Sequence, residues 1–380
     1  MSIIQAIRLS RTPIAGLSGV GVFWGGFAAF IPDIKARVAA SDAELGLALM
    51  MAAAGGIVAM YFGPKLVGRF GRHTMPVAAV LLAVAFVYPL MAGSVPALAL
   101  AVFGMGASVS FLDITANLRV TVLEERHDLH LMNLNHAMFS FAFALSALVA
   151  SLARKAGWGP GDLFPILALV VMALGLVMIE RRSWQGAPPA PDGADHAGIW
   201  SAILPVAAIL FVAFVCENAT DSWSALHIER TLGGLTGDGG FGPMMLGLTM
   251  GVGRMSGQFA AQKLGEAGLI FWSAVVGVAG ALVIAAAPTP AVAILGVGLL
   301  GLGVAVTVPS ANSILGKLVR PDQRGYAISR AWMIGFTGFF VGPTLMGQIS
   351  EYAGLRSAFF FVAVMMVLIL PCVLALRRQV

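Results

Sequence analysis

The sequence contains twelve apolar stretches, each about long enough to cross a lipid bilayer as a helix, separated by short polar segments. A helix needs about 20 predominantly apolar residues to cross the hydrocarbon core of a membrane. The stretches lie near residues 13–31, 44–63, 75–92, 96–122, 131–153, 162–180, 199–222, 241–262, 268–287, 290–316, 326–348 and 355–376. They predict an all-α polytopic membrane protein with twelve transmembrane helices.

The composition excludes a soluble globular protein. Apolar residues make up 59% of the chain and charged residues 11%, against roughly 45–50% and 25% in soluble domains. Twelve helices of this length occupy about 240 residues, so there is no room for a domain outside the membrane. The first stretch is longer than the apolar core of a signal peptide, and we expect it to be retained.

The distribution of basic residues predicts the orientation of the chain. Of the 23 Lys and Arg residues, three lie within the stretches: Arg119, Arg254 and Arg330. Six lie in loops after odd-numbered stretches: Lys35, Arg37, Arg154, Lys155, Arg230 and Arg356. The remaining fourteen lie in the two tails and in loops after even-numbered stretches. Because basic loops stay in the cytoplasm, both termini are predicted to be cytoplasmic, in a multi-pass protein of the cell inner (plasma) membrane.

The chain has two halves with related patterns. Residues 183–198 are polar and rich in Pro, Ala and Gly, which is typical of a flexible linker. Three residues after the second stretch recur after the eighth: Gly63, Arg69 and Gly71 correspond to Gly257, Lys263 and Gly265. We therefore expect two pseudo-symmetric six-helix bundles, residues 1–182 and 199–380, joined by a cytoplasmic linker at 183–198.

The segment GPKLVGRFGRH at 63–73 resembles the loop motif of the major facilitator superfamily, and the likeness covers the whole chain. Gly68 stands where that motif usually has Asp. A narrower resemblance is to the fucose permease branch of sugar–proton symporters and its uncharacterised relatives. It rests on FWGGFAAFIPDIK (23–35), FLDITAN (111–117) and MNLNHA (132–137), where His136 replaces the usual Gln. The resemblance implies that two bundles expose a midplane cavity alternately to each side of the membrane.

Polar residues inside the fourth and fifth stretches are candidates for this cavity. An ionised side chain at the bilayer centre costs roughly 2.5–3.5 kcal/mol, so a buried charge calls for a partner, water or neutralisation. Asp113 and Asn117 are four residues apart on one helix face, and Asn133 and His136 are three apart on another. We expect Asp113 to couple proton movement, which also matches the acid of the fucose permease branch, and Asn117, Asn133 and His136 to bind solute.

The seventh and first stretches supply further candidates. Glu217 is a second candidate for proton coupling, and Asn218 and Asp221 are expected to bind solute. Trp24, in the middle of the first stretch, can stack on a sugar ring. Structural roles are the alternatives: Trp24 can pack between helices, and His136 can bond to a carbonyl.

Asp113 and Arg330 are predicted to form an inner gate. Both lie in the cytoplasmic half of helices that line the inner mouth in the family that the chain resembles. We expect their side chains to approach each other when the protein closes towards the cytoplasm, and to separate when it opens. The alternative for Arg330 is that its side chain extends to the cytoplasmic interface.

The sequence lacks the motifs of an enzyme or an ATP-driven pump. HExxH, GxSxG and GxxxxGK[ST] do not occur. Gly296, Gly298 and Gly301 fit GxGxxG but lie inside an apolar stretch, which predicts helix packing. Cys216 and Cys372 lie in apolar stretches and predict neither a disulfide nor a metal site. We expect no cofactor and no metal.

These observations favour a proton-coupled secondary active transporter that moves a small polar solute. A sugar-like molecule is the favoured solute class. A proton-driven exporter of metabolites or drugs is one alternative, and a non-transporting membrane sensor or receptor is another. The expected partners are the solute, protons and the lipid bilayer. The basic residues form no block, so no nucleic acid is expected, and we expect a monomer.

Overall fold

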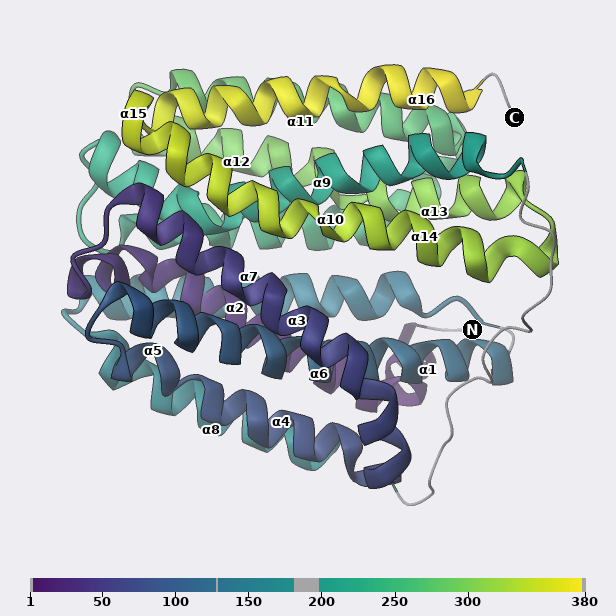
Figure 1. The fold of residues 1–380 in the computed structure, drawn as a ribbon, viewed down its shortest axis with the longest axis horizontal. Coiled ribbons are helices and arrows are strands. Elements are labelled where there is room, and N and C mark those ends of the chain that lie inside the picture. The colour runs from purple at the N-terminus through teal and green to yellow at the C-terminus, as the bar shows by residue number, and fades with distance from the viewer. Residues whose placement is uncertain (1–2, 128, 181–197, 378–380) are drawn as a thin grey trace.

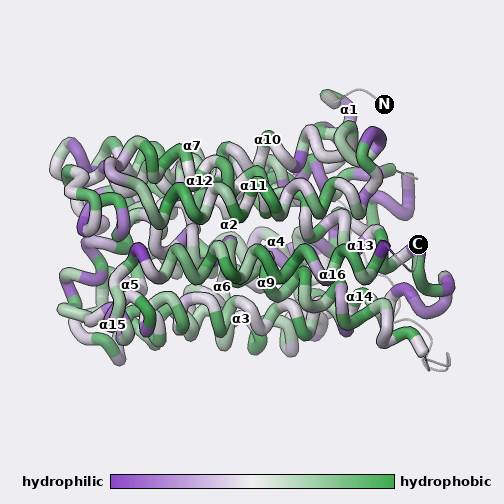
Figure 2. The backbone as a smooth tube through the Cα atoms, turned by 90° about the horizontal axis from the view of Figure 1, so that it is seen from above, coloured by the Kyte–Doolittle hydropathy of each residue, from purple (hydrophilic) through white to green (hydrophobic). Residues whose placement is uncertain are grey.

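The computed structural model describes residues 3–127, 129–180 and 198–377, and these residues form helices, turns and loops without a β-strand. The predicted linker at 183–198 lies outside the described residues except for Gly198, so the division at this segment stays a prediction. The long helices run roughly side by side, with the first half of the chain below and the second half above in the view of Figure 1. Apolar segments fill the middle of the helices and polar segments gather towards their ends (Figure 2), as a membrane protein requires.

The first half is built from long helices joined by short loops. Its helices are α1 (Ile3–Leu9), α2 (Arg11–Arg37), α3 (Asp42–Phe70), η1 (Gly71–His73), α4 (Thr74–Ala85), α5 (Tyr88–Met91), α6 (Val95–His127), α7 (Met132–Lys155) and α8 (Pro160–Val177). Ser41 and Glu44 form a reciprocal capping box at the start of α3, which fixes where that helix begins.

The second half repeats this arrangement. Its helices are α9 (Trp200–Leu226), η2 (His227–Thr231), η3 (Asp238–Gly240), α10 (Phe241–Leu264), α11 (Glu266–Ala286), α12 (Pro290–Ala305), α13 (Thr307–Leu318), η4 (Pro321–Gln323), α14 (Arg324–Phe336), α15 (Gly338–Val367) and α16 (Ile369–Arg377). Gly71 after α3 and Gly265 after α10 both have positive φ, 50° and 69°, a conformation that favours glycine. The corresponding helices of the two halves therefore end on the same residue type.

The helices account for twelve membrane crossings. In the described part of the chain, ten helical stretches are long and apolar enough to span a membrane. The last of these, Arg324–Arg377, holds two crossings, because Gly354 breaks α15 with a φ of 80°. The remaining crossing is α10, whose 24 residues include the polar side chains of Arg254 and Gln262. The predicted all-α polytopic fold of twelve transmembrane helices is confirmed.

Two of the predicted spans are broken helices. The span at 75–92 ends as α4 at Ala85 and resumes as α5 at Tyr88, and the span at 290–316 ends as α12 at Ala305 and resumes as α13 at Thr307. Pro89 and Pro309 follow these ends by four residues. A proline has no N–H to donate to the carbonyl four residues earlier, which explains both breaks.

Small residues allow neighbouring helices to approach closely. A Cβ added to Gly106 of α6 would lie 2.0 Å from the Ala52 carbonyl oxygen of α3, and one on Gly303 would lie 2.5 Å from Gly277 Cα. Gly296 faces α11, and Gly298 and Gly301 face Met245 and Thr249 of α10. The packing role predicted for this glycine pattern is confirmed, because lipid supplies little hydrophobic drive and helices associate by close contact.

The two halves are in close contact at one end of the molecule. We call the end where α8 finishes and α9 begins the linker end, and the other the distal end; both chain termini lie at the linker end (Figures 1 and 2). Near the distal end, Gly46 of α3 lies against Pro343 and Gly347 of α15. Further along α3, a Cβ at Gly63 or Gly68 would meet no atom within 4 Å. The described conformation is therefore closed at its distal end.

Candidate functional site

Polar side chains of α6 and α7 meet in the first half, near the second turn of α7. Asn117 Oδ1 lies 2.9 Å from His136 Nε2, and Asn117 Nδ2 donates to the Asp113 carbonyl oxygen at 3.0 Å. All three side chains are partly exposed although they lie inside membrane-spanning helices. The structure thus brings together three of the residues predicted from the sequence.

Arg254 connects this group to the second half. Its Nη1 donates to Ser140 Oγ at 2.5 Å and to the His136 carbonyl oxygen at 3.4 Å, and its Nη2 lies 3.7 Å from Glu217 Oε1. The side chains of Arg254 and Glu217 are 13% and 23% exposed. One guanidinium from α10 therefore contacts α7 of the first half and α9 of the second.

Sequence reasoning did not include Arg254 or Ser140 among the site residues. The available signal for Arg254 was its place near the middle of the eighth apolar stretch. Ser140 carries no such signal, because a serine inside a transmembrane helix is common and usually bonds to its own backbone. Ser140 does this as well, since its Oγ donates to the His136 carbonyl at 3.0 Å.

Asn218 and Asp221 lie one turn apart on α9, beyond Glu217 towards the distal end. The Oδ1 atom of each is buried and has no hydrogen-bond partner among the described residues. Trp24 of α2 is partly exposed and makes edge-on contacts with Phe23 and Phe27, at ring-centroid distances of 5.6 and 5.8 Å. The structure thus places Trp24 in an aromatic cluster and leaves part of its surface free.

Asn133 and Arg330 lie nearer the linker end. Asn133 is exposed in the first turn of α7, one turn before His136. The guanidinium of Arg330 lies 4.8 Å from the centre of the Tyr326 ring, and its Nη1 lies 4.0 Å from Met333 Sδ. Within the described part of the chain, Arg330 and Asp113 form no ion pair in this conformation. Their predicted approach concerns a conformation closed at the linker end, and it stays a prediction.

Two groups of ion pairs hold the halves together at the distal end. Arg154 of α7, 3% exposed, pairs with Asp33 of its own half and with Glu229 of η2, which accepts from Nη1 at 2.5 Å and from Nη2 at 3.0 Å. Arg230 donates to both carboxylate oxygens of Asp42, the first residue of α3. We call Asp33–Arg154–Glu229 and Arg230–Asp42 the closing ion pairs.

Further contacts support the closing ion pairs. Asp42 also accepts from Ser350 of α15 and pairs with Lys35 at 3.2 Å. Glu351 Oε2 of the second half accepts from the Asp42 backbone N–H at 2.8 Å and so caps α3 across the interface. Lys155 pairs with Asp238 at 2.7 Å, and although partial burial opposes it, hydrogen bonding to Lys155 holds the pKa of the Asp238 carboxyl below its usual value.

The positions of Arg154 and Arg230 correct part of the sequence interpretation, which placed both in loops. Arg154 lies in the last turn of α7, and Arg230 lies in η2, a π-helical turn that extends α9. Their helices continue past the apolar stretches, and each arginine pairs with a carboxylate on the other half. That carboxylate is far away in sequence, so no local pattern could reveal it.

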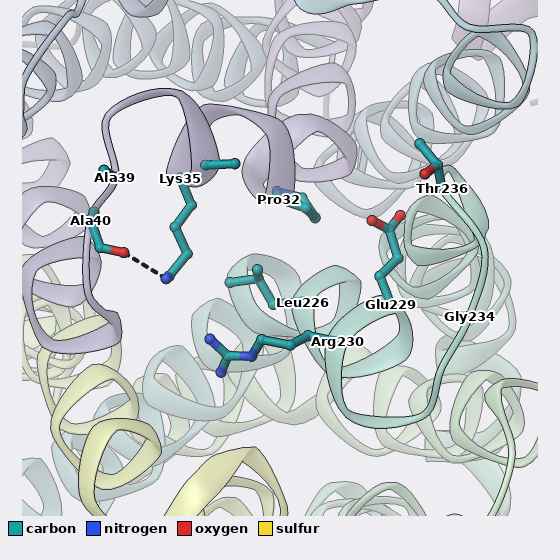
Figure 3. A pocket seen from close by; sticks show the side chains of 10 residues that line it. Pro32, Lys35, Ala39, Ala40, Leu226, Glu229, Arg230, Gly234 and Thr236 are labelled. Atoms are coloured by element: carbon teal, nitrogen blue, oxygen red, sulfur yellow. Dashed lines mark hydrogen bonds between the residues drawn. The ribbon is translucent and has the colours of Figure 1, made fainter.

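A cavity of about 540 Å³ opens between the halves at the distal end. Figure 3 shows Lys35 of α2 on one side and Arg230 and Glu229 on the other. All three take part in ion pairs at this end of the molecule. The cavity therefore lies among the contacts that close the molecule and is separate from the group around Arg254.

A family model described as Major Facilitator Superfamily matches residues 14–299 and 261–380. The chain belongs to the major facilitator superfamily. The superfamily predicted from the sequence is confirmed, and with it a membrane transporter without an enzymatic role. The comparisons do not single out the fucose permease branch within it.

Relatives in the superfamily match the chain over nearly its whole length. An uncharacterized MFS-type transporter of Yersinia pestis is 24% identical over 365 residues, covering 95% of this chain and 94% of its own. The crystal structure of a D-xylose-proton symporter matches with a TM-score of 0.76 at 16% identity, covering 100% of this chain and 98% of its own. A bacterial homolog of the human lysosomal transporter Spinster, in an inward-facing and occupied conformation, matches with a TM-score of 0.74 at 14% identity and the same coverage.

The closing ion pairs generate a prediction about conformation. Replacing Arg154 with Gln leaves Glu229 without its cation, and breaking a buried pair costs about 3–5 kcal/mol. We expect the distal end to open in a larger fraction of molecules, measured as a longer distance between spin labels at positions 37 and 235. Arg320→Gln is the control, because it removes an exposed pair with Asp322. An unchanged distance distribution in Arg154→Gln would contradict this role.

Proposed function

We propose that the chain is a proton-coupled secondary active transporter that moves a small polar solute across the cell inner membrane, with a sugar-like molecule as the favoured solute class. The observation that carries this proposal is the polar group centred on Arg254, which joins Ser140 and His136 of one half to Glu217 of the other. A solute that binds between the halves at this depth can be passed from one side to the other when the halves rock. The D-xylose-proton symporter with the same fold supports a sugar-like solute and proton coupling.

Alternating access follows from the contacts at the two ends. The described conformation is held shut at the distal end by the closing ion pairs. Opening the distal end requires these pairs to separate, and new contacts at the linker end must compensate for them. The proposed pair of Asp113 and Arg330 supplies such a contact, because both residues lie on the linker-side half of their helices.

Asp113 and Glu217 are the proposed proton-coupling residues. Asp113 has no basic partner among the described residues, whereas Glu217 lies 3.7 Å from Arg254. A carboxyl group without a cation at this depth gains from binding a proton, because protonation removes its charge. Asn117 bonds to the Asp113 carbonyl oxygen and to His136. We assign Asn117 and His136 to solute binding with Asn133, Asn218, Asp221 and Trp24.

The first test removes the titrating group. Asp113→Asn should abolish uptake driven by a pH gradient while leaving solute exchange partly intact, because the amide keeps the size of the side chain but cannot carry a proton. Uptake and exchange of a labelled solute in proteoliposomes measure the two activities. Glu125→Gln is the control, an exposed acid on the same helix. Gradient-driven uptake at the wild-type rate in Asp113→Asn would transfer the coupling role to Glu217.

A second test concerns the proposed gate. Arg330→Asp should inactivate transport, because it places a second carboxylate where Asp113 needs a cation. Adding Asp113→Arg should restore opening and closing, though not proton coupling. Spin labels at positions 69 and 322, both exposed at the linker end, report the distance across the mouth. A double variant that moves no better than either single variant would rule out the pair.

A third test concerns orientation. We propose that both termini and residues 183–198 face the cytoplasm, because fourteen of the basic residues lie in the segments on that side. In a background without Cys216 and Cys372, Ala190→Cys should resist an impermeant maleimide added to intact cells, whereas Leu235→Cys, exposed at the distal end, should react. The reverse labelling pattern would show that the linker end faces the outside of the cell and the distal end faces the cytoplasm.

A further inference from the structure

We propose that the transported solute carries a protonated amine, and that Asp221 and Asn218 bind this group. The solute class is then an amino sugar or a related polyhydroxylated amine. This inference rests on the proposed function and makes its solute more specific. It follows from the charges, unpaired acceptors and aromatic surfaces that the described residues place along the second half of α9.

The charges at this depth do not balance. Asp113 of α6 and Glu217 and Asp221 of α9 lie within membrane-spanning helices, and among the described residues the one basic side chain paired with any of these carboxylates is Arg254, which pairs with Glu217. Arg254 directs one nitrogen at Glu217 and the other at Ser140 and at the His136 carbonyl. Asp221 forms no ion pair with any described residue. The site therefore has room for at least one positive charge that the chain does not supply.

The unpaired atoms specify the kind of cation. Asp221 Oδ1 and Asn218 Oδ1 are both buried hydrogen-bond acceptors without a donor among the described residues. They lie three residues apart and therefore on one face of α9. An ammonium group has several N–H donors and no acceptor, so it can satisfy both atoms at once. Rotating the Asn218 amide would offer a neutral N–H instead, which leaves the carboxylate charge uncompensated.

An aromatic cluster lies one helical turn before Asn218, towards the linker end of α9. Phe214, one turn before Asn218, stacks on Phe339 with ring centroids 4.7 Å apart and contacts the Trp332 ring at 5.4 Å. Trp332 is 38% exposed, and its Nε1 donates to Asn312 Oδ1 at 3.2 Å. Aromatic faces attract organic cations and also stack on the apolar faces of sugar rings. A solute that enters from the linker end thus meets aromatic surface first and carboxylate beyond it.

A neutral sugar does not explain the same features. Its hydroxyl groups could bond to both acceptors, but the negative charge of Asp221 would stay uncompensated inside a membrane-spanning helix. A protonated Asp221 would balance the charge without an amine. In that case an amine would gain nothing over a hydroxyl group, and the two explanations predict different binding preferences.

The experiment compares two matched probes on purified full-length protein at mildly acidic pH. D-glucosamine carries an ammonium group where D-glucose carries a hydroxyl group. Dissociation constants are measured by the shift in melting temperature or by calorimetry, with tetraphenylphosphonium as a lipophilic cation that has no N–H donor. The variants are Asp221→Asn, and Asp322→Asn as a matched control at an exposed surface position.

We expect D-glucosamine to bind at least about tenfold more tightly than D-glucose. D-glucose lacks the ammonium group that would pair with Asp221, and leaving a buried charge unpaired weakens binding. Asp221→Asn should abolish this preference and Asp322→Asn should keep it. Equal binding of both sugars, or a preference that survives in Asp221→Asn, would overturn the amine inference and leave the proposed transport of a polar solute intact. Binding of tetraphenylphosphonium without either sugar would overturn the proposed function as well.

Discussion

The energetic cost of a charge inside a bilayer is the constraint on which the rest of this structure depends. Each ionised side chain at the centre costs roughly 2.5–3.5 kcal/mol unless it is paired or hydrated. Between the halves, Arg254 meets this constraint by contacting Glu217 in its own half and Ser140 in the other. Because one guanidinium serves both halves, its contacts cannot all stay the same when the halves move. A group that is costly to bury thus lies between the two halves, where we propose that the solute binds.

Charged contacts between the two halves are concentrated at the distal end of the molecule. The distal end has charged side chains paired across the interface, and a backbone cap that Glu351 supplies to α3 from the opposite half. Such pairs are worth little when exposed but are costly to break when buried, so they hold one conformation and can still be exchanged for other contacts. Between the ends, close packing at glycines such as Gly106 and Gly303 keeps each half rigid enough to move as one body.

Polar residues and an aromatic cluster lie close to each other along α9. Glu217, Asn218 and Asp221 follow one another on the same side of the helix, and Phe214 begins a cluster with Trp332 and Phe339 from α14 and α15. The carboxylates favour a cation, while the rings favour a solute with apolar faces. Together they support our proposal of a solute that has both a cationic group and apolar faces.

The sequence by itself determined the membrane class, the number of helices, and the fact that Asp113, Asn117, His136 and Glu217 lie inside helices. These follow from apolar length and helical periodicity, which are local properties of the chain. Tertiary structure alone decided that Arg254 reaches Ser140, that Arg154 and Arg230 are paired between halves and do not lie free in loops, and that Trp332 joins Phe214. Each of these contacts joins residues far apart in sequence. The order of charges along the sequence cannot show which distant residue will pair with a given charged side chain.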